Sequence, residues 1–356
     1  MPWYSYREVC RRFSDVHLID TPRIDAVVER LSSLQRYGLS VRQQRLLSAY
    51  HGRLISHKVR RIAPDVLLSV GASHKVLAAD LGCPIIHVSD GLFSTMVGYY
   101  EKYGRLQTST RRNAHADHQR LLDKTGLALF ASEWARSSAV QLYRYPGEQT
   151  RVIPFGANID EDPGFRQRRD NGPLELLFVG YDWKRKGGST VLATWRELRK
   201  RTGDARLHIV GCDPYEARGY EGVTIHGRLN KAVKRDAQRI DELFRTASVF
   251  FMPSNQEAFG IVFCEAAAYG LPVIATDTGG VSTPVAHGET GLLLPPAATA
   301  RDFVDQILTL WQDKPRYQAF SVAARRRYET RLNWSAWGQG VSDAIDTVLD
   351  PLGMAV

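Results

Sequence analysis

Two glutamates separated by seven residues stand at the most informative point of this chain. They belong to the stretch Asn255-Gln-Glu-Ala-Phe-Gly-Ile-Val-Phe-Cys-Glu265. The apolar runs 249–254 and 272–277 on either side of it are predicted buried strands, and 259–270 is a predicted helix. Glu257 is then in the turn between strand and helix. Glu265 lies roughly 9 Å further along the helix axis, at ~1.5 Å per residue.

The beginning of that helix is suited to an anion. Its first amide hydrogens lack partners within the helix, and the helix dipole adds positive charge there. A phosphate could bind at this point, with a carboxylate on either side to accept hydrogen bonds from hydroxyl groups. A nucleotide sugar, which has a central diphosphate and hydroxyl groups at both ends, would fit. The alternative is that both glutamates are ordinary helix-cap or surface carboxylates.

Short apolar runs alternate with amphipathic stretches through most of the chain. Such alternation indicates parallel sheets covered by helices on both faces, in two doubly wound α/β domains that bind ligands at the carboxyl ends of their strands. The predicted strands are 66–70, 84–90, 127–132 and 150–156, then 174–180, 206–211, 223–227, 249–254, 272–277 and 290–295. The predicted helices include 74–82, 133–143, 188–201, 236–247, 259–270 and 300–313.

The predicted domains are residues 1–160 and 171–333. A polar segment, 158–173, holds two prolines and two glycines and is the predicted linker. The helix predicted at about 334–350 could pack back on the first domain. At the other end of the chain, PWYSYREVCRRF is a predicted helix and VHLID (16–20) a predicted strand.

Composition excludes several classes of protein. The 356 residues are 44% hydrophobic, with no apolar run long enough to cross a membrane and no visible signal peptide. The cysteines, Cys10, Cys83, Cys212 and Cys264, are far apart and form no Cys-x-x-Cys, which argues against a zinc site or a disulfide framework. Reduced thiols fit a cytoplasmic location.

The net charge of +9 is concentrated in the first half. Residues 1–150 hold 21 Lys and Arg against 13 Asp and Glu, which leaves a surplus of 8 positive charges. An anionic partner, such as a lipid phosphate or the inner membrane surface, is one interpretation, and a solvated Arg-rich surface is the other. Nucleic acid is disfavoured, because no recognisable binding module accompanies the basic residues.

The second half carries a combination of motifs. Glu-x7-Glu with Phe-Gly inside it is followed by GLPVIATDTGGV and HGETGLLLP, and VGYDWKRKGG (179–188) precedes them. From about residue 174 to 296 the chain resembles the retaining glycosyltransferases of family 4, also called group 1. This resemblance implies the GT-B fold, an α/β fold of two doubly wound Rossmann-like domains facing a central cleft. The first half is similar more loosely, through HVSDGLF (87–93) and 131–160.

The resemblance implies roles for the donor-side residues. Lys186 would contact the donor diphosphate and stabilise the charge of the leaving group without a metal; the alternative is a solvated lysine beside Lys184 and Arg185. Tyr181 departs from the family, whose members usually carry an arginine there. Lys184 or Arg185 could substitute, because a tyrosine hydroxyl is a weaker phosphate partner than a guanidinium.

Other roles follow from the same resemblance. Glu265 would accept hydrogen bonds from the donor ribose, and Glu257 from the transferred sugar. Gly279 and Gly280 could let the backbone approach the sugar, although tight turning alone would explain them. Backbone groups would bind the diphosphate at Phe259, Gly260, Ile261 and Val262, and the base at Gly227, Arg228 and Leu229.

Asp90, at the end of the strand 84–90, is the candidate in the first domain. It could accept a hydrogen bond from a sugar hydroxyl or help the acceptor lose a proton, or it could simply cap the next helix. His87 points to the other face of that strand and is predicted to be a core histidine. Asp160-Glu161-Asp162 looks like a metal-binding motif but lies in the predicted linker, so it is interpreted as solvated. Neither a metal nor a cofactor is expected.

The resemblance therefore implies metal-independent transfer of a sugar, with retained configuration, to a hydroxyl of a glycan or lipid-linked acceptor. The enzyme would be cytoplasmic or peripheral on the inner membrane face. One alternative is a catalytically degenerate GT-B subunit that binds a nucleotide sugar or a partner enzyme; another is a GT-B epimerase. Tyr181 favours the degenerate subunit, as does the apparent lack of the family's first strand and glycine-rich loop. A start codon placed too late would also explain that lack.

Overall fold

The computed structural model describes residues 2–31, 45–167 and 171–350. The chain forms two compact units. Residues 1–154 and 337–356 belong to the first unit, and residues 155–336 belong to the second. Each unit is built around one parallel sheet.

The second unit has a six-stranded sheet in the order β10-β9-β8-β5-β6-β7, and all its pairings are parallel. The chain order reverses between β5 and β8, which is where doubly wound sheets bind ligands. Its strands are β5 (Glu175–Val179), β6 (Arg206–Val210), β7 (Val223–Gly227), β8 (Val249–Met252), β9 (Val273–Thr276) and β10 (Gly291–Leu294). Its helices are α9 (Gly188–Thr202), α10 (Lys234–Thr246), α11 (Ile261–Ala268), α12 (Ala300–Gln312) and α13 (Lys314–Thr330), with a 3₁₀ turn, η4 (Tyr215–Ala217).

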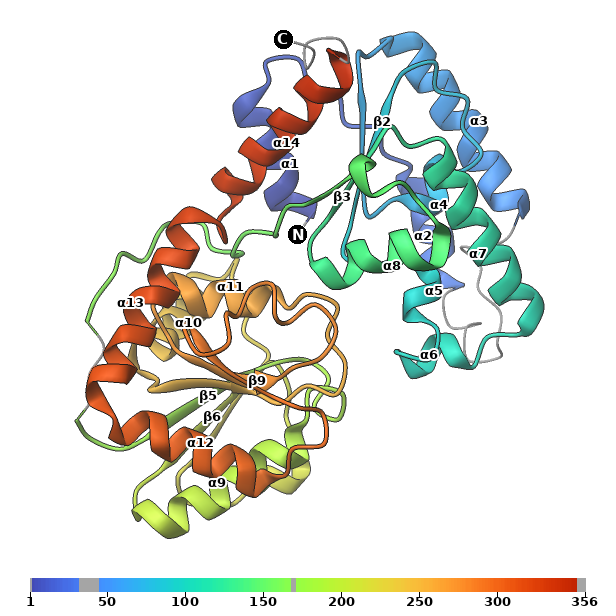
Figure 1. The fold of residues 1–356 in the computed structure, drawn as a ribbon. Coiled ribbons are helices and arrows are strands. Elements are labelled where there is room, and N and C mark those ends of the chain that lie inside the picture. Colours follow the sequence, from blue (N-terminus) through green and yellow to red (C-terminus); the bar gives the residue numbers. More distant parts are fainter. Residues whose placement is uncertain (1, 32–44, 168–170, 351–356) are drawn as a thin grey trace. The chain divides into compact units, whose positions relative to one another are not determined.

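The apolar runs explain this sheet. Every residue of β8, β9 and β10 is buried, as expected for parallel strands covered on both faces. Helices α9 and α12 lie side by side, and α11 packs on α13. Figure 1 shows α9 and α12 on one face of the sheet and α10 and α11 on the other.

The first unit has a four-stranded parallel sheet in the order β1-β2-β3-β4. Its strands are β1 (Leu67–Val70), β2 (Ile85–Ser89), β3 (Leu127–Phe130) and β4 (Thr150–Val152). Its helices are α1 (Pro2–Arg12), α2 (Pro22–Arg30), α3 (Arg45–Ile62), α4 (Ser73–Val76), α5 (Phe93–Met96), α6 (Glu101–Gly104), α7 (Thr108–Asp123) and α8 (Glu133–Tyr143), with a 3₁₀ turn, η3 (Gly147–Gln149).

Helix α14 (Trp334–Leu349) runs from the second unit into the first. Within the first unit it packs on α1: a Cβ added to Gly338 would lie 2.4 Å from the Nε atom of Arg12. Arg12 also donates to Gln339 at 2.9 Å. Arg151, in β4, donates to Thr347 at 2.8 Å.

Some sequence predictions need correction. The segment 16–20 is not a strand: none of its residues is buried, and Leu18 is 62% exposed, whereas a strand of a covered parallel sheet would be buried. The helix predicted at 74–82 is reduced to α4. The first domain was predicted to extend to residue 160, but residues 155–160 pack in the second unit. There the Ala157 amide donates to the Leu332 carbonyl at 2.9 Å.

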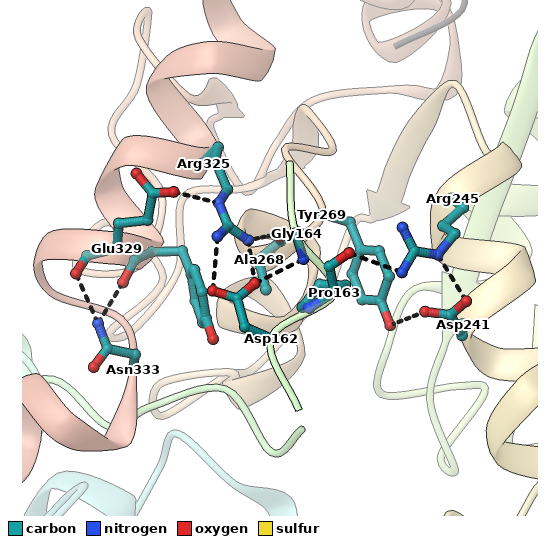
Figure 2. Close-up of polar contacts among 11 residues, drawn as sticks. Asp162, Pro163, Gly164, Asp241, Arg245, Ala268, Tyr269, Arg325, Glu329 and Asn333 are labelled. Carbon is teal, nitrogen blue, oxygen red and sulfur yellow. Dashed lines mark hydrogen bonds and ion pairs between the residues drawn. The ribbon is translucent and has the colours of Figure 1, made fainter. Parts of the chain in front are cut away.

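The segment that enters the second unit is fixed by ion pairs (Figure 2). Arg325 is buried, and its Nη1 and Nη2 atoms each donate to the Asp162 carboxylate at 2.7 Å. Arg325 also donates to the Ala268 carbonyl at the end of α11 and to Glu329. The Asp162 side chain is 51% exposed, which agrees with the interpretation as solvated, but its carboxylate is also bonded to a buried cation. That bond holds the pKa of Asp162 below its usual value.

Two observations bear on the wider character of the protein. None of the helices in the described part of the chain is long and apolar enough to cross a membrane. Cys10, Cys83, Cys212 and Cys264 are free cysteines.

Candidate functional site

The loop after β5 is held tightly against the loop after β8. Gly187 has a left-handed backbone, with φ of +76°, and a Cβ at this position would lie 1.9 Å from the Pro253 carbonyl oxygen. Only glycine allows this approach. The Asn255 amide donates to the Arg185 carbonyl at 2.9 Å, and its side chain donates to the Lys184 carbonyl at 3.2 Å.

This packing brings Lys186 and Glu257 together. The two side chains form a short ion pair although each is only 11% exposed. Arg185 lies on the same side, with its Nη1 atom 4.0 Å from the Glu257 carboxylate and 2.8 Å from the Gln256 carbonyl. Two candidate residues that are 71 positions apart in sequence are therefore direct partners.

Burial lowers the pKa of Lys186 below its usual value, and the Glu257 carboxylate opposes that shift. A buried lysine loses hydration in its charged form, so it requires an anion beside it. Glu257 provides that anion in the structure. An anionic ligand could take over the same role.

Helix α11 begins at Ile261 rather than at the predicted residue 259, because Gly260 has φ of +84° and ends the loop. Phe259 is a buried core residue ahead of the helix, and its ring packs edge-on against Phe155 at 5.5 Å. The amides of Ile261 and Val262 open the helix, where the helix geometry leaves them without partners inside it.

Glu265, the fifth residue of α11, is paired with a residue that the sequence analysis did not select. Lys231 donates to the Glu265 Oε1 atom at 2.6 Å and to the Asn158 carbonyl at 2.7 Å. A buried carboxylate in an apolar helix is expected to have a cationic partner, because an unpaired buried charge is strongly destabilising. The sequence alone does not indicate that this partner comes from the loop after β7.

The loops after β5 and β7 also meet through side chains. Tyr181 is 72% exposed, and the guanidinium of Arg228 lies 5.9 Å from the centre of its ring, within the usual cation–π range. Leu229, next to Arg228, is half-buried. Lys184 is exposed.

The glycine pair after β9 contacts the same loop as Glu257. The Gly280 amide donates to the Glu257 carbonyl at 3.1 Å, and the Thr278 hydroxyl donates to the Asn255 carbonyl at 3.3 Å. Gly279 has a left-handed backbone, with φ of +56°. Loops after β5, β8 and β9 are thus joined around Glu257.

In the first unit, Asp90 is exposed directly after β2. His87, within β2, is 1% exposed and is a core histidine as predicted; its burial lowers its pKa to about 4. In the same unit, the Oγ atom of Ser94 and the Nδ1 atom of His115 lie 2.6 Å apart, and the Tyr143 hydroxyl donates to Ser94 at 3.0 Å. Among the described residues, no group of three or more His, Cys, Asp or Glu is arranged to hold a metal ion.

Two α/β units, each built on a parallel sheet, are the architecture of the GT-B fold. Sucrose-phosphate synthase from Thermosynechococcus elongatus shares it, with a TM-score of 0.67 and 19% identity over 86% of this chain and 79% of that one. HepE of Anabaena, solved with UDP and glucose, has a TM-score of 0.62 and 17% identity over 83% and 81% of the two chains.

Residues 173–313 match the family model described as group 1 glycosyl transferases. D-inositol 3-phosphate glycosyltransferase of Corynebacterium aurimucosum is 28% identical over 272 residues, which are 71% of this chain and 63% of that protein. The chain spans about 59–69% of the length of the first three curated relatives that it matches.

Proposed function

We propose that this protein is a glycosyltransferase that binds a nucleoside diphosphate sugar in its second unit. The buried Lys186–Glu257 ion pair at the turn before α11 carries this proposal. It combines a cation for the diphosphate with an acceptor for sugar hydroxyls, beside a helix start that favours anions. The match of residues 173–313 to the group 1 glycosyl transferases supports the same interpretation.

The ion pair explains how the site would work. A bound diphosphate would compete with Glu257 for Lys186 and would also take the amides that open α11. Glu257 would then accept hydrogen bonds from the sugar that is transferred. As the bond between the anomeric carbon and the phosphate oxygen breaks, negative charge grows on the leaving diphosphate. Lys186 and the helix amides would stabilise that charge.

We further propose that the transfer retains anomeric configuration and needs no metal, since Lys186 and the α11 amides would balance the leaving charge. The acceptor would be a hydroxyl of a glycan or lipid-linked molecule. The surplus of 8 positive charges in residues 1–150 supports an anionic acceptor. A cytoplasmic enzyme at the inner membrane face would meet such acceptors. Asp90 remains the candidate residue for the acceptor hydroxyl.

The test is a panel of nucleoside diphosphate sugars, with UDP, GDP and dTDP as the nucleotides. Saturation-transfer NMR would report binding, and single-turnover assays with glycan, polyol phosphate and lipid-linked acceptors would report transfer. We expect one nucleotide to bind and its sugar to be transferred. Absence of binding by every member of the panel would overturn the proposal. Binding without transfer to any acceptor would favour the degenerate subunit.

A further inference from the structure

Lys231 connects three separate segments of the second unit. It lies in the loop between β7 and α10, four residues after Gly227 ends β7. Its ammonium group donates to the Glu265 Oε1 atom on α11 at 2.6 Å. It donates also to the carbonyl of Asn158, in the segment that enters this unit, at 2.7 Å. One side chain therefore fixes a loop and a carboxylate relative to each other.

Glu265 needs such a partner. It is 7% exposed, and the residues that follow it in α11, Ala266 to Ala268, are buried. An ionised carboxylate in these surroundings requires a cation and hydrogen bonds to stay charged and in place. Among the described residues, Lys231 is the side chain that forms an ion pair with Glu265.

The pairing also leaves one carboxylate oxygen for a ligand. Lys231 bonds to Oε1, whereas Oε2 accepts no hydrogen bond from the residues that the structure describes. Two of the three ammonium hydrogens of Lys231 are used, and the third remains for another acceptor. A pair of neighbouring hydroxyl groups could bind here, one donating to Oε2 and the other accepting from Lys231.

We infer that Lys231 is a positioning residue that holds Glu265 for the two ribose hydroxyls of the nucleotide, and so makes the site selective for ribonucleotides. This inference rests on the proposed function. It adds a residue outside the predicted donor set and assigns it to a particular part of the ligand. Lys231 would act on the ribose, by holding Glu265 and by donating to one hydroxyl, and not on the reacting bond.

The experiment compares ribonucleotides with their deoxy forms by calorimetric titration. UDP and GDP are first titrated into the wild-type protein, and the one that binds more tightly is kept together with its 2′,3′-dideoxy form. The variants are K231M, which keeps the length of the side chain without its charge, and K231R, which keeps the charge. K234M removes an exposed positive charge three residues away and is the matched control.

We expect wild type to prefer the ribonucleotide by about tenfold or more, as for a hydrogen bond to a charged group. K231M should bind the ribonucleotide about tenfold more weakly and the dideoxy form within about twofold of wild type. K231R should recover part of the loss, and K234M should change neither affinity by more than about twofold. In transfer assays K231M should raise KM for the donor more than it lowers kcat.

Different failures are distinguishable. If wild type binds neither UDP nor GDP, the proposed function fails, and the inference with it. If wild type binds but does not prefer the ribonucleotide, or if K231M keeps the full preference, the inference about Lys231 is wrong while donor binding stands. Tighter ribonucleotide binding by K231M would also contradict it, since the ion pair would then be a competitor of the ligand.

Discussion

The two units share an architecture of helices around a parallel sheet, but they differ in the ionisable side chains that they bury. In the second unit the buried Lys186 is paired with the buried Glu257, and the half-buried Lys231 is paired with the buried Glu265. The first unit also contains histidines whose surroundings favour the neutral form. Burial lowers the pKa of His87 to about 4 and that of His118, which has other histidines around it, to about 3.

This difference separates two kinds of charge in the molecule. The positive surplus of the first half includes exposed side chains such as Arg11, Arg60 and Arg61. The Lys186–Glu257 pair of the second unit is buried and compensated, so an anionic ligand can exchange with a partner that is already present. Paired burial, and not net charge, is what points to the donor site.

The largest expected effect comes from breaking the first pair. Lys186→Ala should reduce the single-turnover rate about 100- to 1000-fold, because it removes a cation from the leaving diphosphate. Lys200→Ala, an exposed lysine at the end of α9, is the matched control and should keep the wild-type rate. Normal turnover in Lys186→Ala would contradict the proposal that Lys186 stabilises the leaving diphosphate.

Gly187→Ala tests whether close loop packing creates that pair. Its Cβ would collide with the Pro253 carbonyl at 1.9 Å, and its φ is +76°, so we expect a loss of about 3 kcal/mol in unfolding free energy. Gly203→Ala has a similar φ, +84°, but no atom within 4 Å, and should cost only about 1 kcal/mol. Urea titrations would measure both, and equal losses would argue against the packing described.

The neutral histidine of the first unit predicts a pH dependence. The pKa of His87 is lower in the folded state, about 4, than its ordinary 6.5, so the unfolded state binds more protons between these values. The free energy of unfolding should therefore decrease as the pH is lowered, by about 2 kcal/mol from pH 7 to pH 5 for this one group.

The variant His87→Leu should reduce that dependence, whereas His57→Gln, at an exposed position on α3, should not. Urea unfolding at the two pH values measures the effect. If His87→Leu keeps the full pH dependence, the conclusion that His87 is buried in its neutral form is wrong.

The smallest effect concerns the ion pair in Figure 2. Asp162→Asn weakens the two bonds to Arg325, which keeps Glu329 and the Ala268 carbonyl, so we expect a loss of about 1–2 kcal/mol. Asp305→Asn breaks a more exposed pair with Arg201 and should cost less than about 0.5 kcal/mol.

The pKa of Asp162 is lowered, so this contribution should be complete above its usual 3.8 and be lost as pH falls through the lowered value. Thermal unfolding of both variants at neutral pH is the measurement. A larger loss of stability in Asp305→Asn than in Asp162→Asn would contradict the expectation that the pair with the buried arginine contributes more.

The sequence predicts the second unit well because continuous apolar runs such as β8 and β9 specify buried parallel strands. It misplaces the start of α11, since a left-handed Gly260 can close a loop as readily as it can join a helix. It also predicts a strand at 16–20 from hydrophobicity alone, where none of the residues is buried. Apolar character indicates a strand only if something covers it.

The site shows a similar limit. Motif spacing selects Lys186, Glu257 and Glu265, but it does not show that the first two bind each other. Lys231 escapes notice because its partner is 34 residues away and on another element. Such pairings depend on which loops the fold brings to the same place, and local pattern does not record that.

A crystal structure of the protein with UDP or GDP tests the central claim most directly. The account predicts that the diphosphate lies at the amides of Ile261 and Val262, with Lys186 turned from Glu257 towards a phosphate oxygen. A nucleotide bound away from α11, with the Lys186–Glu257 pair unchanged, would contradict it.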